Sequence, residues 1–170
     1  RLVGQSGKVA MVMQKPGGTS TVLREQGFAE TMSNEFPGVR IAGRQYGMAD
    51  PARSRAVAED LLTAHPDLAG IFASSEAASI GSIQAIRARH LSRKVHLVTF
   101  DSSRMHVDAL RDGTSDVMLV QDPFRLGYEA VKSLADKLDG KIPPKHVELP
   151  VHVIAKADLD RPDVRTLLKI

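Results

Sequence analysis

The sequence predicts an α/β fold in which a parallel β-sheet carries helices on both faces, a layering similar to flavodoxin-like and Rossmann-like folds. Short apolar runs rich in Val and Ile alternate five times with segments of helical period. These runs are too uniformly apolar to have a solvent-facing side, which is typical of strands in a parallel sheet covered on both faces. A hydrophobic fraction of 42% in 170 residues is sufficient for such a core.

The first unit begins with a strand predicted over residues 9–13, VAMVM. A Lys-Pro-Gly-Gly-Thr loop follows it. A helix is then expected over residues 20–34, because Phe28, Met32 and Phe36 recur at the i, i+4 and i+8 positions of a helical face.

The second and third units repeat this order. Strands are predicted over residues 39–45 and 70–73. The second helix is expected to begin at Asp50-Pro51, since Asp is favoured at the N-cap and Pro at the first helical position. The third follows Ser-Ser-Glu, and its apolar side carries Ile80, Ile83 and Ile86.

The fourth and fifth units have strands predicted over residues 95–100 and 117–120. A short helix after the fourth strand should stop at Gly113, because Gly adopts the left-handed conformation that ends helices. The fifth helix carries Val131, Leu134 and Leu138 and should stop at Gly140. After Pro143-Pro144 a last strand is expected over residues 147–154, followed by a polar tail.

Five polar loops should meet at one edge of this sheet. Right-handed crossovers place the carboxyl ends of parallel strands on the same edge, and ligands of open α/β sheets bind outside those ends. The loops expected at this edge comprise residues 14–20, 46–50, 74–76, 101–104 and 121–123. Their side chains are therefore the candidates for ligand binding.

Several classes of chemistry lack support in the sequence. There is no cysteine, which excludes thiol nucleophiles and thiolate metal sites, and the six histidines are scattered without ligand spacing. The GQSGK segment at residues 4–8 precedes a strand and lacks the Ser or Thr of a phosphate-binding loop, and no GxGxxG or GxSxG occurs. We therefore predict no cofactor, no metal and no enzymatic activity. A sugar-processing α/β enzyme stays as an alternative because the sheet edge is polar.

The net charge of +3 allows an anionic partner, and the densest basic run is residues 87–94. That run lies at an expected helix end, where cations face solvent and complement the helix dipole. No DNA-binding motif surrounds it, so this chain is not expected to bind nucleic acid.

The polar groups that remain suit a neutral polyol. Asp101 can accept hydrogen bonds from two adjacent hydroxyls, Arg24 can donate two, and the Gln121 amide can donate and accept. Each has a structural alternative: Asp101 as a cap for the turn at Ser103, Arg24 as a solvated helix residue, and Gln121 as an amide bonding its own loop.

Four motifs in order resemble one family, the type I periplasmic sugar-binding proteins. These are ribose-binding-like solute receptors of ABC transporters, and they share their fold with the effector domains of LacI-type repressors. The motifs are REQGF at residues 24–28, LTAHPDLAGIFASSEAASIG at 62–81, VTFD at 98–101 and VQDPFRLG at 120–127. The resemblance implies two α/β lobes that close on a sugar.

The resemblance covers only the later part of such a protein. It implies that residues 8–121 form most of the second lobe. Residues 122–170 would supply the crossover helix, closing strands and tail that link back to a first lobe, most of which is absent. We therefore expect this chain to be a fragment.

The family's sugar ligands map onto particular positions here. Its pocket arginine falls on Arg24, its carboxylate after the fourth strand on Asp101, and its hinge-side glutamine on Gln121. An Asn-Asp pair after the third strand is replaced by Ser75-Glu76, whose alternative role is helix cap and first-turn acid.

A second departure concerns the loop after the second strand, where the family has an aromatic residue and this chain has Met48. The chain also has no Trp, so Tyr46 and Phe100 are the candidates for stacking on a sugar, although a residue placed like Phe100 more often belongs to the core. The ligand is therefore not necessarily ribose.

The tail, residues 147–169, resembles the transport receptors more than the repressors. The resemblance thus implies a sugar or polyol ligand, an ABC permease as partner and a periplasmic location. The alternative is the effector domain of a LacI-type regulator, which would be cytoplasmic.

Overall fold

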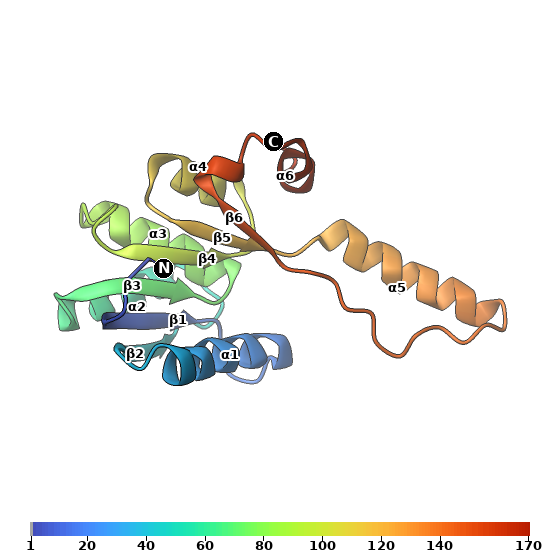
Figure 1. Cartoon of the computed structure of the whole chain (residues 1–170), viewed down its shortest axis with the longest axis horizontal. Coiled ribbons are helices and arrows are strands. Elements are labelled where there is room, and N and C mark those ends of the chain that lie inside the picture. Colours follow the sequence, from blue (N-terminus) through green and yellow to red (C-terminus); the bar gives the residue numbers. More distant parts are fainter. Residues whose placement is uncertain (1) are drawn as a thin grey trace.

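The computed structural model describes residues 2–170, built around a six-stranded sheet of order β2-β1-β3-β4-β5-β6 (Figure 1). Neighbouring strands among the first five are parallel, as predicted. The strands are β1 (Gly7–Met13), β2 (Val39–Tyr46), β3 (Leu68–Ala73), β4 (His96–Phe100), β5 (Val117–Val120) and β6 (His152–Ala155).

The last strand is shorter than predicted, and it is the strand that runs antiparallel to its neighbour in the described sheet. β6 begins at His152 rather than at residue 147, and it pairs antiparallel with β5, from Val120 opposite His152 to Val117 opposite Ala155. Residues 147–151 approach the sheet from the far end of α5 (Pro123–Leu138) as exposed chain (Figure 1). The strand prediction was wrong there because an apolar alternation forms a strand only where a neighbouring strand is within reach.

The other helices are α1 (Thr19–Glu35), α2 (Pro51–Ala64), α3 (Glu76–Ala88), α4 (Arg104–Asp112) and α6 (Pro162–Leu168), with a 3₁₀ turn, η1 (Lys156–Asp158). The predicted helix boundaries at Asp50 and Gly113 are confirmed. The Asp50 carboxylate accepts from the Arg53 backbone N–H at 2.7 Å, and Gly113 ends α4 with a φ of 80°.

One face of the sheet is well covered. α2 and α3 pack on it through side chains that include Leu61, Ile83 and Ile86. α4 and α6 extend the layer over β5 and β6, where Leu110 and Ile154 are each 1% exposed.

Among the helices of residues 2–170, α1 alone covers the opposite face (Figure 1). Phe28 of α1 stacks on Phe72 of β3 with ring centroids 4.5 Å apart. Beside this contact an apolar groove is lined by Met32, Phe36 and Val98, among others. The fifth helix, α5, projects away from the sheet (Figure 1). It buries none of its residues, so helices lie on both faces as predicted, but unequally.

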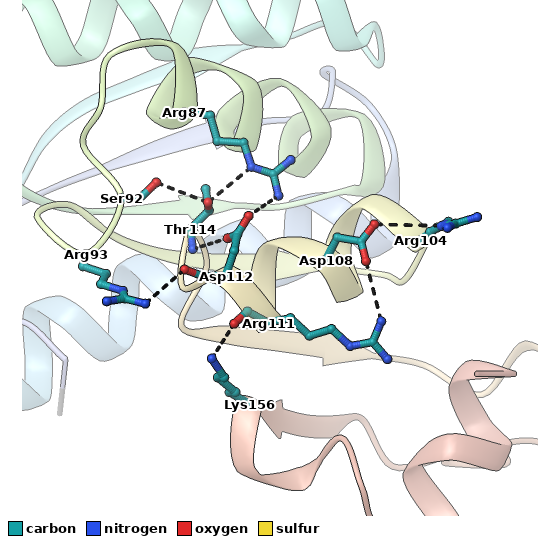
Figure 2. Close-up of polar contacts among 9 residues, drawn as sticks. All are labelled: Arg87, Ser92, Arg93, Arg104, Asp108, Arg111, Asp112, Thr114 and Lys156. Carbon is teal, nitrogen blue, oxygen red and sulfur yellow. Dashed lines mark hydrogen bonds and ion pairs between the residues drawn. The ribbon is translucent and has the colours of Figure 1, made fainter.

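Polar contacts join the carboxyl-terminal ends of α3 and α4 (Figure 2). Arg87 pairs with Asp112 at 2.7 Å and donates to the Thr114 hydroxyl at 3.3 Å. Lys156 donates to the Arg111 carbonyl. Arg87, the first residue of the basic run, therefore makes an internal contact at the sheet edge opposite the loops predicted to bind a ligand.

Candidate functional site

Arg24 lies at the predicted ligand edge, in the second turn of α1. Its guanidinium donates to the backbone carbonyl of Ser74, directly after β3, and its carbon Cζ lies 3.2 Å from the centroid of the Phe100 ring. Burial lowers the pKa of Arg24, while the charges of Asp101 and Glu25 act in the opposite direction. The side chain is thus held against the sheet edge, unlike an ordinary solvated helix residue.

Asp101 follows β4 and faces Arg24. Its backbone has a φ of 68°, and its N–H donates to the Leu119 carbonyl at 2.8 Å. Burial raises the pKa of the carboxyl group, whereas the positive charge of Arg24 and the backbone N–H of Glu76 lower it. The N-cap position of α4 belongs to Ser103, so Asp101 is directed to Arg24 and α3 rather than to the cap of α4.

Ser75 and Glu76 occupy the roles that their structural alternative predicts. Ser75 is the N-cap of α3, and its hydroxyl accepts from the Ala78 N–H at 3.4 Å. Glu76 is exposed in the first turn, where a carboxylate favours the helix dipole. The backbone N–H of Glu76 nevertheless interacts with the Asp101 carboxylate.

Met48 and Gln121 lie on separate loops of this edge. Met48 is 45% exposed and, like Ala49, has a φ of 58°. Hydrogen bonds from Gly47 to Met13 and from Ala49 to Gln14 fix that loop to the end of β1. Gln121 is half-buried directly after β5. The structure therefore places Arg24 and Asp101 near enough for their charges to interact. Gln121 follows β5, the strand next to β4, and Met48 follows β2, the outermost strand on the other side of the sheet.

Sequence reasoning missed Glu25 altogether, and it placed Ser74 in an open loop rather than buried against Glu25. Glu25 is 7% exposed, Ser74 is fully buried, and the Glu25 carboxylate accepts from the Ser74 hydroxyl at 2.6 Å. The signal was present, since the apolar stripe through Phe28 and Met32 continues backward in helical spacing to Glu25 and Thr21. Polar residues on a buried stripe require partners.

The assembled groups are hydrogen-bond donors and acceptors. Within residues 2–170 no group of three or more His, Asp or Glu side chains is placed to hold a metal ion. None of the helices in this described part has the length and apolar character needed to cross a membrane. A carboxylate and a nearby guanidinium can accept from and donate to the hydroxyls of a polyhydroxylated ring. The Phe100 ring, 3% exposed, supports Arg24 and is not open for stacking on a ligand.

Comparison with known proteins identifies the family. Residues 1–142 match the family model described as a periplasmic binding protein domain. The chain belongs to this family of periplasmic binding proteins. Its relatives are transport receptors for sugars rather than enzymes.

The curated relatives of this periplasmic binding protein are about twice its length. The ribose import binding protein of Bacillus subtilis is 25% identical over 88% of the chain and 47% of its own length. The D-ribose/D-allose-binding protein of Pseudomonas aeruginosa is 27% identical over 80% of the chain and 43% of its own. The chain thus spans about half the length of the relatives it matches.

Solved structures agree with this assignment. A carbohydrate transporter solute-binding protein from Agrobacterium radiobacter, in complex with D-arabinose, is 29% identical with a TM-score of 0.92, over 96% of this chain and 55% of its own. An ABC transporter solute-binding protein from Agrobacterium vitis, bound to α-D-tagatopyranose, is 29% identical with a TM-score of 0.94, over 98% and 56%.

Proposed function

We propose that this chain supplies the second lobe of a sugar receptor for an ABC transporter and binds a monosaccharide or related polyol in a cleft between two lobes. Residues 8–121 would form the lobe, and residues 122–170 the connection to the first lobe. The observation that carries the proposal is that Arg24 and Asp101 lie near enough at the carboxyl edge of the sheet for each charge to act on the pKa of the other, with the Arg24 guanidinium held over the Phe100 ring.

Each group has a role in this proposal. The Asp101 carboxylate accepts from two neighbouring sugar hydroxyls, and Arg24 donates to a ring or hydroxyl oxygen. Gln121, Ser75 and Glu76 add further polar contacts from adjacent loops. Met48 supplies the apolar contact that an aromatic side chain makes in the resembled family.

The exposed apolar surface of α5 supports a two-lobed protein. Phe124, Val131, Leu134 and Leu138 of this helix are between 61% and 79% exposed. Single exposed apolar residues are common, but a row of them on one helix indicates a packing surface. A first lobe is the partner we propose for it.

The similar proteins are transport receptors, which favours a receptor over a cytoplasmic regulator. The partner of the sugar-bound receptor would then be an ABC permease, and its location would be the periplasm. Both the partner and the location belong to the proposal.

Thermal unfolding against a panel of pentoses, hexoses and sugar alcohols tests the function. It is performed on this chain and on a version joined to a first lobe. A ligand at about 100 times its dissociation constant should raise the unfolding free energy by about 2.7 kcal/mol. Asp101→Asn keeps a residue type that tolerates the left-handed backbone and should remove the shift, while the exposed Asp60→Asn should keep it. Absence of a shift with every sugar in both proteins would contradict the proposal.

A further inference from the structure

Glu25 is a buried carboxylate that the proposed sugar contacts do not use. One of its oxygens, Oε1, accepts from the Ser74 hydroxyl at 2.6 Å and from the Gln14 backbone N–H at 3.2 Å. The Ser74 hydroxyl oxygen in turn lies 3.2 Å from the same Gln14 nitrogen. The three groups form a closed set that joins α1 to the ends of β1 and β3.

The same serine supplies the hydrogen-bond acceptor of Arg24. The Ser74 backbone carbonyl is the acceptor for the Arg24 guanidinium, and the Ser74 N–H donates to the Val12 carbonyl at 3.0 Å. Ser74 is therefore fixed through its backbone by β1 and through its side chain by Glu25. Its carbonyl then presents one orientation to the guanidinium, which the Phe100 ring supports from another side.

A carboxylate suits this position better than a neutral side chain. Hydrogen bonds to an ionised acceptor are shorter and stronger than those between neutral groups. The negative charge of Glu25 also favours the protonated guanidinium of Arg24, which burial opposes.

We propose that Glu25 is a positioning residue for the ligand site, acting through Ser74 to hold the Arg24 guanidinium toward Asp101. This role of Glu25 adds to the proposed function, and its test by sugar affinity rests on that function. Arg24 and Asp101 would touch the sugar, whereas Glu25 would set the geometry of Arg24.

A double-mutant cycle on sugar affinity separates positioning from simple stabilisation of the fold. Glu25→Gln should weaken binding about tenfold in the wild-type background and less than about twofold in an Arg24→Ala background. Glu30→Gln, the same substitution on an exposed turn of α1, should leave affinity unchanged in both backgrounds. Equal losses from Glu25→Gln in both backgrounds would overturn the proposal, because a structural role does not require Arg24.

If no sugar binds, the mobility of the Arg24 guanidinium in the ligand-free protein tests the positioning role instead. Nitrogen-15 NMR of the Arg24 guanidinium in this 170-residue chain should show slow rotation in the wild type and fast rotation in Glu25→Gln and Ser74→Ala. Unchanged rotation in both variants would refute the positioning role. If both substitutions abolish the slow rotation but no sugar binds to the protein, the result would support the positioning role of Glu25 and reject a sugar as the ligand.

Discussion

Two buried serines on one helix offer a sharp test of how the ligand edge is supported. Ser79 and Ser82 of α3 are both 0% exposed. The Ser79 hydroxyl accepts from the Phe100 N–H at 2.9 Å and donates to the Phe100 carbonyl at 3.2 Å. The Ser82 hydroxyl has no hydrogen-bond partner among the described residues. Replacement of each by Ala should therefore have different consequences.

Ser79→Ala removes the hydroxyl that pairs the backbone of Phe100, itself 3% exposed. A buried N–H without a partner costs about 1–3 kcal/mol, and the weaker bond to the carbonyl is lost as well, so the unfolding free energy should fall by about 2–3 kcal/mol. In a chain of this size the melting temperature should drop by roughly 5–10 °C.

Ser82→Ala is the matched control, because it removes a hydroxyl that the fold buries without a partner. It should leave stability unchanged or raise it by up to about 1 kcal/mol. Urea unfolding followed by circular dichroism, together with calorimetry, measures both variants. Similar losses of unfolding free energy in the two variants would refute the reasoning, because the hydrogen bonds of Ser79 would then make no difference to stability.

Three further predictions concern other parts of the molecule. Ala49→Gly should stabilise the chain by about 0.5 kcal/mol in urea unfolding, because relief of the left-handed φ of 58° exceeds the entropy that Gly adds to the unfolded state; destabilisation would contradict this. Burial lowers the pKa of His106 from 6.5 to about 4, so the unfolded state binds the proton first as pH falls. Stability should then decline between pH 6.5 and 4 by on the order of 3 kcal/mol, and urea unfolding of His106→Gln should lack that component. Because the apolar row on α5 is exposed, the isolated chain should self-associate in sedimentation, and Val131→Glu with Leu134→Glu should reduce that association while changing the unfolding free energy by less than about 0.5 kcal/mol; a monomeric starting chain would contradict this.

The parts of the fold that the sequence predicted well are those with local causes. Asp50-Pro51 starts α2 and Gly113 ends α4 because capping and left-handed geometry depend on neighbouring residues. The meeting of Arg24 and Asp101 was predictable too, since parallel strands bring their carboxyl ends to one edge.

The features that escaped prediction depend on contacts made elsewhere in the molecule. The apolar spacing of Val131, Leu134 and Leu138 is the same whether α5 packs on its own sheet or projects from it, so periodicity could not give its direction. The direction of β6 follows from where the chain returns, and the burial of Glu25 depends on Ser74 lying beneath it.

The pairing of Val120 with His152 means that residues 121–151 leave and rejoin the sheet at adjacent points of two antiparallel strands. This segment is therefore an insertion between the two strands of a β-hairpin, β5 and β6. A two-residue Asn-Gly turn, the type that closes such hairpins, would join the two strands directly. The shortened chain would lose Gln121 but keep Arg24, Asp101 and the packed face of the sheet, and it would provide a compact scaffold on which the rest of the ligand edge can be redesigned as an independent module.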